Sequence, residues 1–179
     1  MKGIIFTEFL DLVEEKFGLE TLDRVLDLAE DEGIYTSVGS YDHQKLVKLI
    51  VQLSRETNIS PEVLQEVFGE CAFIKLYETL PQKESLQQCG TTLEFIRHVE
   101  HYIHVEVKKL YPDANPPKFE FIDETESHLI FDYCSVRCMS HVCFGLIKGC
   151  ANHYDETVNV EMTPNQDDAS RVRFAVSIM

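Results

Sequence analysis

Apolar residues recur every three or four positions along the first half of the chain, which is the spacing of helices with one buried face. This spacing predicts helices over Ile4–Phe17, Leu22–Gly33, His43–Arg55, Pro61–Gly69 and Cys71–Thr79. Ser60 is a suitable N-cap for the fourth of these helices, and Pro61 suits its first turn. Residues 82–90 are predicted to form a polar linker.

The apolar spacing changes to strict alternation after Pro116 and Pro117, as expected where extended backbone begins. The second half is predicted to contain strands Lys118–Ile122, His128–Cys134, Thr157–Met162 and Arg171–Ile178, turns over Asp123–Ser127 and Thr163–Ser170, and a helix over Cys138–His153. Gly145 and Gly149 share a face of that helix and predict close contact with another segment. The expected fold is α+β, with a helical N-terminal half followed by antiparallel hairpins around one helix.

A single long helix is predicted over Thr91–Tyr111, between the two halves. Thr91 and Glu94 have the spacing of a capping box, and Pro112 ends the helix. Its apolar stripe comprises Leu93, Ile96, Ile103, Val107 and Leu110. His104 lies at the edge of this stripe, where an imidazole is either a satisfied core histidine or a metal ligand.

Composition narrows the class of protein. The chain has 179 residues, of which 44% are hydrophobic and 26% charged, so we expect one globular domain over residues 1–179. Its net charge of −15 disfavours binding to nucleic acids and to anionic membranes. We expect a cytoplasmic protein, because the sequence contains no signal peptide and no apolar run of roughly 18 or more residues. The six cysteines contain no C-x2-C pair and are expected to be reduced thiols.

Three polar residues alternate at the end of the second predicted strand. Tyr133, Ser135 and Arg137 would point to the same side if the strand continued through them. Such a set suits a ligand with two carboxylates, because a guanidinium binds a carboxylate through two parallel hydrogen bonds. Taken alone, the spacing favours an ordinary polar strand edge over such a ligand site.

The series MKGIIF, IHVEVKKLYP, NPPKF, Y-x-S-x-R and GLIKG resembles the haem nitric oxide/oxygen binding family, H-NOX, over the whole chain. The resemblance implies haem b buried between the two halves, with His104 as the only protein ligand to iron. It places Tyr133, Ser135 and Arg137 at the haem propionates. Three further positions are implied at the porphyrin: Pro117, Ile5 and Leu146.

The resemblance also bears on the gas that is bound. Oxygen-binding members carry a tyrosine where this chain has Val142, and a second polar position of the pocket aligns with Ala72. Neither side chain donates a hydrogen bond, so the implied function is a nitric oxide sensor that also binds carbon monoxide. The family is not enzymatic. Its implied output is a separate partner, either a histidine kinase or a cyclic-di-GMP enzyme.

Two other classes of function remain open from the residues. A non-haem metal enzyme would use His98, His101 and His104 with Glu94 or Glu100, although the helical spacing turns His98 away from His104. A haem-free interaction module would keep His104 as a core residue. The absorption spectrum of the purified protein separates all three hypotheses.

Overall fold

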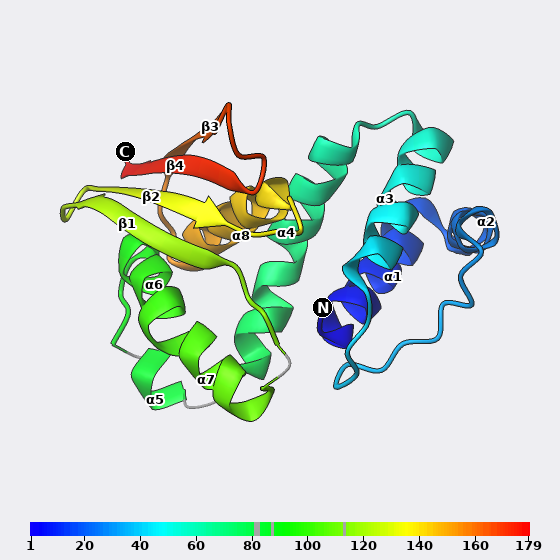
Figure 1. Ribbon diagram of the computed structural model, residues 1–179, viewed down its shortest axis with the longest axis horizontal. Coiled ribbons are helices and arrows are strands. Elements are labelled where there is room, and N and C mark those ends of the chain that lie inside the picture. The colour runs from blue at the N-terminus through cyan, green and yellow to red at the C-terminus, as the bar shows by residue number, and fades with distance from the viewer. Residues whose placement is uncertain (81–82, 87, 113) are drawn as a thin grey trace.

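The structure, a computed structural model, describes residues 1–80, 83–86, 88–112 and 114–179. Its helices are α1 (Gly3–Phe17), α2 (Leu19–Ala29), α3 (His43–Thr57), α4 (Pro61–Thr79), α5 (Lys83–Leu86), α6 (Thr92–His98), the π-helix η1 (Val99–Ile103), α7 (His104–Leu110) and α8 (Ser140–His153). Its strands are β1 (Lys118–Glu124), β2 (His128–Cys134), β3 (Val158–Pro164) and β4 (Arg171–Ile178). Helices α1 to α3 lie together at one side of the molecule, and α4 separates them from the sheet (Figure 1).

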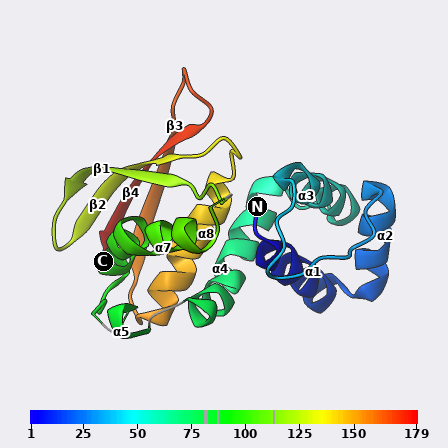
Figure 2. The ribbon, with the colours of Figure 1, turned by 60° about the horizontal axis from the view of Figure 1, so that its bottom comes forward.

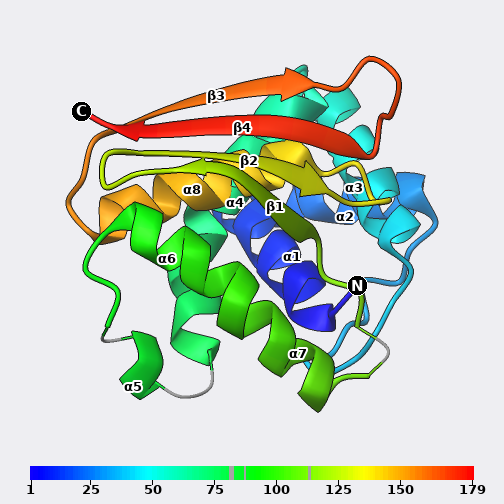
Figure 3. The same cartoon turned by 60° about the vertical axis from the view of Figure 1, so that its left-hand side comes forward.

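The sheet is fully antiparallel, with strand order β1-β2-β4-β3. Phe131 in the central strand β2 pairs with Phe121 of β1 and Phe174 of β4, and its ring stacks on that of Phe174. Alternate residues of the strands face inward and pack on α6 and α8, which lie beneath the sheet in Figure 3. The predicted α+β fold, with antiparallel hairpins around one helix, is confirmed.

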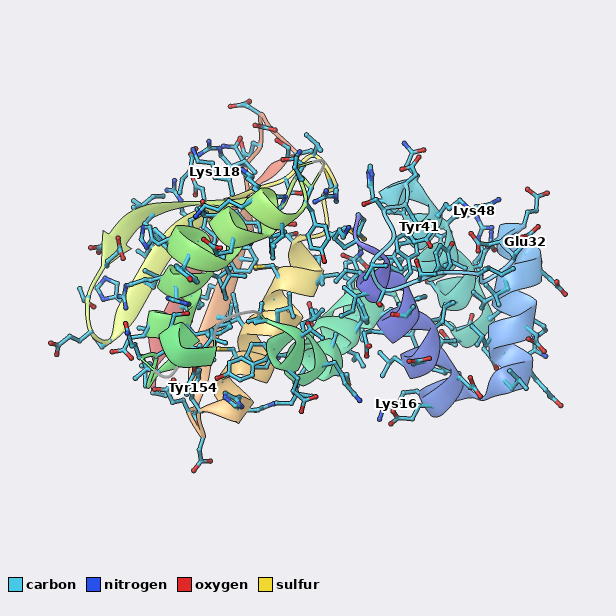
Figure 4. All side chains as sticks on the ribbon, turned by 90° about the horizontal axis from the view of Figure 1, so that it is seen from below. Lys16, Glu32, Tyr41, Lys48, Lys118 and Tyr154 are labelled. Carbon is cyan, nitrogen blue, oxygen red and sulfur yellow. The ribbon has the colours of Figure 1, made fainter. Side chains whose placement is uncertain are left out.

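Helices α1, α2, α3 and the first half of α4 form a separate core, visible at the right of Figure 2. Its largest fully buried side chains are Phe6, Phe9, Phe68, Leu46, Leu49, Ile50 and Leu53. Figure 4 shows Tyr41 and Lys48 on this helical half, with Lys118 and Tyr154 on the sheet half. The ammonium of Lys2 lies 3.7 Å from the centroid of the Tyr111 ring, which joins α7 to the helical half.

Helices α4 and α8 cross with their backbones in contact. A Cβ atom at Gly69 would collide with the carbonyl of Val142, and one at Gly145 would collide with the carbonyl of Glu66. A Cβ at Gly149 would lie 2.6 Å from the carbonyl oxygen of Glu70. The predicted close contact at Gly145 and Gly149 is therefore confirmed. The predicted helix end at Gly69 is wrong, because this glycine serves the crossing and α4 continues through it to Thr79.

Several predicted boundaries also change. Helix α2 ends at Ala29 rather than near Gly33, because Glu30 adopts the left-handed conformation with φ of 52°. The predicted linker contains the short helix α5, whose Leu86 is buried, while residues 82 and 87 of that linker lie outside the described residues. Strand β1 extends to Glu124, which shortens the predicted hairpin turn. Within the described residues, no helix is both long and apolar enough to cross a bilayer.

The predicted helix over Thr91–Tyr111 is present, but its hydrogen-bonding period changes at its centre. The Thr91 hydroxyl caps α6 by accepting from the backbone N–H of Glu94, as predicted. The Glu94 carboxylate accepts from the N–H of Gly90, one residue earlier than a standard capping box requires. Between α6 and α7 lies the π-helix η1, an insertion that is frequent at functional sites.

Candidate functional site

A cavity of about 820 Å³ lies between the helical half and the helix that carries His104. Ligand pockets in proteins span roughly 300–1,000 Å³. The lining is mainly apolar and comes from α1, α4, α8, the α6–η1–α7 helix, the loop before β1, and the end of β2. Its apolar members include Ile4, Phe73, Leu76, Phe95, Ile96, Val99, Ile103, Val107, Leu110, Phe119 and Ile147.

His104 lines this cavity and is held from behind by Glu100. The Nδ1 atom of His104 lies 2.9 Å from Oε2 of Glu100, and their side chains are only 13% and 21% exposed. The same carboxylate oxygen accepts a hydrogen bond of 2.9 Å from the backbone N–H of Phe119 in β1. Glu100 lies in η1, so one oxygen joins the histidine helix to the sheet.

The charge state of Glu100 fixes the tautomer of His104. Burial disfavours ionisation of this carboxyl group, but the hydrogen bonds from His104 and Phe119 outweigh burial and lower its pKa. An ionised carboxylate only accepts hydrogen bonds, so we assign the donor role in this contact to Nδ1 of His104. The lone pair on Nε2 is then the one available to a ligand in the cavity.

Tyr133 in β2 and Arg137 in the loop after this strand also line the cavity. Burial raises the pKa of the Tyr133 phenol and keeps it protonated as a donor. Arg171 and Arg173 form ion pairs with acidic side chains of the sheet. Arg137 forms no such pair within the part of the chain that the structure describes. Its guanidinium is thus available to an anionic ligand.

Ser135 does not line the cavity. Strand β2 ends at Cys134, so strand alternation does not place Ser135 and Arg137 as predicted. The Ser135 hydroxyl accepts from the backbone N–H of Arg137 at 3.3 Å, and its own N–H donates to Ser170 at 2.8 Å. In this structure Ser135 therefore shapes the loop that presents Arg137.

The remaining residues implied by the resemblance divide into two groups. Ile5, Pro117, Val142 and Leu146 line the cavity. Ala72 does not, and it lies in the core of the helical half. The side of the cavity formed by α8 is therefore apolar at Val142 and Leu146.

Sequence reasoning overlooked three features of the site: the carboxylate behind His104 and two side chains that line the cavity. Glu100 was considered only for a non-haem site, although its position four residues before His104 was a signal for side-chain pairing. Tyr77 brings a phenol to the cavity from α4, with its ring centroid 4.5 Å from that of His153. Cys143 brings a thiol from α8, and burial raises its pKa to about 12, so the thiol remains protonated.

The three histidines of the long helix do not converge. His98 lies 3.3 Å from the Ser85 hydroxyl, and the His101 ring packs against Phe121. His104 alone turns to Glu100 and the cavity. No group of three metal-binding side chains forms among the residues placed here, so the geometry gives no support to the non-haem metal enzyme.

Comparison with known proteins agrees with this geometry. The family model described as Haem-NO-binding matches residues 2–162. The unliganded Fe(II) H-NOX protein from K. algicida is 36% identical, with a TM-score of 0.92 over 100% of this chain and 97% of that one. The IWP-051-bound H-NOX from Shewanella woodyi in its Fe(II)CO state is 37% identical, with a TM-score of 0.81 over 99% and 94%.

A more distant structure shows the same fold. The S. oneidensis H-NOX protein in its Fe(II)NO state is 21% identical, with a TM-score of 0.88 over 100% of this chain and 99% of that one. No curated protein sequence matches the chain. The family model covers most of the sequence, and the H-NOX structures superpose on nearly all of it. The chain therefore belongs to the Haem-NO-binding (H-NOX) family of haem-binding gas-sensor domains.

Proposed function

We propose that this chain binds haem b through Nε2 of His104 and senses nitric oxide. The observation that carries the proposal is the His104 imidazole, held at Nδ1 by Glu100 and facing a largely apolar cavity of about 820 Å³. Bound haem would supply a ferrous iron that binds a diatomic gas. Arg137 and Tyr133 would bind the propionates as charged and neutral donors, with Ser135 supporting their loop.

The side chains that would face the gas favour nitric oxide over oxygen. Val142, Leu146 and Ile5 are apolar members of the cavity wall and donate no hydrogen bond. Oxygen bound to ferrous haem would carry partial negative charge and would lack a stabilising hydrogen bond here, worth about 0.5–1.5 kcal/mol or more as charge develops. Nitric oxide needs no such donor. Carbon monoxide is expected to bind as well, and the S. woodyi relative is an Fe(II)CO protein.

We infer a signalling role in the cytoplasm, through a separate histidine kinase or cyclic-di-GMP enzyme and without catalysis by this chain. The net charge of −15 favours a basic surface on that partner. If nitric oxide weakened the bond between iron and His104, the α6–η1–α7 helix would be released and its contacts with the helical half would change. The Lys2–Tyr111 contact lies at this boundary.

The test is an absorption spectrum of the reduced protein under anaerobic conditions, after addition of nitric oxide, and in a separate sample opened to air. We expect a Soret band that shifts with nitric oxide and no stable oxygen complex in air. His104→Gly should lose haem unless imidazole is supplied, and Tyr77→Phe should leave the response to air unchanged.

Each alternative has its own outcome in this experiment. Iron without a Soret band would support the non-haem metal enzyme, and a colourless, iron-free protein would support the interaction module. A stable oxy spectrum in the wild type would refute selectivity for nitric oxide while leaving haem binding intact. An unchanged spectrum in His104→Gly would move the iron ligand elsewhere.

A further inference from the structure

Glu100 makes two hydrogen bonds through a single oxygen atom. Its Oε2 lies 2.9 Å from Nδ1 of His104 and 2.9 Å from the backbone nitrogen of Phe119. The first bond lies within one helix, and the second reaches strand β1. The His104 ring also packs edge-on against the Phe119 ring, with centroids 5.3 Å apart. The imidazole is therefore fixed by both a carboxylate and an aromatic side chain.

A carboxylate behind a ligating histidine changes the ligand itself. The negative charge strengthens the hydrogen bond from Nδ1. This charge makes Nε2 a more basic electron-pair donor to a metal ion. It also orients the ring and removes the competing tautomer with the proton on Nε2. A backbone carbonyl would orient the ring similarly but would bring no net charge.

We propose that Glu100 is a positioning residue that strengthens the bond between His104 and iron and couples this bond to strand β1. The proposal rests on the proposed function, because it requires iron on Nε2 of His104. Glu100 thereby sets how readily nitric oxide releases the histidine. Because Oε2 is shared, movement of His104 also alters the hydrogen bond to Phe119, which carries the displacement to the sheet.

The sharpest variant is Glu100→Gln, which keeps the size of the side chain and removes its charge. The matched control is Glu106→Gln, the same substitution in α7, where Glu106 pairs with Lys109 rather than with His104. The readouts are the iron–histidine stretching frequency of the ferrous protein and the rate of haem transfer to apomyoglobin. Thermal unfolding of each variant is measured alongside.

Relative to both the wild type and Glu106→Gln, we expect Glu100→Gln to lower the stretching frequency. Haem loss should accelerate by roughly 10–100-fold, the usual effect of removing such a partner of a metal ligand. The nitric oxide complex should shift toward five-coordination. An unchanged frequency together with an unchanged haem loss would overturn the proposal, even if the melting temperature fell.

A second measurement needs no variant. In the wild-type Fe(II)CO protein, the Nδ1 proton of His104 and the amide proton of Phe119 point at the same oxygen and should give a nuclear Overhauser contact. A missing contact between these assigned protons would overturn the shared hydrogen bonding. Failure of the wild type to bind haem, or binding that survives His104→Gly, would instead refute the proposed function.

Discussion

At the scale of single residues, Arg137 offers the most direct test of how the cavity holds an anionic ligand. Arg137→Ala should speed haem loss to apomyoglobin, because the propionate loses a charged hydrogen bond worth about 1.5–3 kcal/mol. Arg173→Ala is the control, since this arginine pairs with Asp132 in the sheet and does not line the cavity. Equal haem retention in Arg137→Ala and wild type would contradict the role at the propionate.

Some of these residues were predictable from sequence and others were not. His104 lies where an apolar stripe meets a polar face. The two-residue spacing of Tyr133, Ser135 and Arg137 was also visible in the sequence. The shared hydrogen bond of Glu100 was not, because Phe119 reaches it only when β1 packs beside η1. Ala72 shows the opposite case, because the resemblance aligned it with a pocket position and the structure places it in the core of the helical half.

At the scale of secondary structure, the crossing of α4 and α8 is the contact most sensitive to small changes. Gly145→Ala should lower the free energy of unfolding by about 1–3 kcal/mol, because a new methyl group overpacks the site against the Glu66 carbonyl. Gly90→Ala is the matched control, with no atom closer than 3.6 Å to the added Cβ. Urea unfolding measures both variants.

Alanine also favours helix formation over glycine by roughly 0.5–1 kcal/mol. If Gly145→Ala instead raised the free energy of unfolding by that amount, α4 and α8 would be able to move apart at little cost. The glycine would then not be required at the crossing.

The same crossing explains why the prediction failed at Gly69 and succeeded at Gly145. A glycine inside an apolar helical pattern marks either a helix end or a close neighbour, and the local sequence does not distinguish them. The pair Gly145 and Gly149 carried more information, because its spacing of four places both on one helical face. The π-helix η1 was not predicted, because it lies inside the helix and does not change the signals for the helix start at Thr91 and the helix end at Pro112.

At the scale of the whole molecule, an ion network on the outer face of the sheet links stability to pH. Asp132 of β2 is 7% exposed and accepts from Arg171 and Arg173 of β4. Arg171 also binds Glu120 of β1, so the network spans three strands. The hydrogen bond from Arg173 is the main cause that lowers the pKa of Asp132 below its ordinary value of 3.8.

Asp132→Asn should lower the free energy of unfolding at neutral pH by about 1.5–3 kcal/mol, the range for hydrogen bonds to a charged group. Because the folded pKa lies below the unfolded one, this contribution is complete above the unfolded value and disappears as pH falls through the folded value. Urea unfolding measures the effect at neutral pH and at a pH below the folded pKa of Asp132. The control is Asp167→Asn, at an exposed position. A stability difference that persisted in acid would contradict an electrostatic origin.

The two-layer arrangement was predictable in outline, since helical spacing gives way to alternation near Pro117. The sequence alone could not predict the cavity between the helical half and the helix that carries His104. The size of the cavity depends on the separation between segments that are distant in sequence, such as those carrying Tyr77, Leu110 and Arg137. No local pattern encodes such a separation, which is why the cavity was inferred through resemblance.

The glycine contact between α4 and α8 has a consequence for how the sensor can diversify. A Cβ at Gly69 would strike the backbone at Val142 and Leu146, two of the α8 residues that line the cavity. Their main-chain positions are thus set by the crossing rather than by their own side chains. Side chains at these two positions of the cavity wall can be exchanged one at a time while the crossing holds the backbone in place. A new ligand preference therefore requires a change of side chain and no redesign of the architecture.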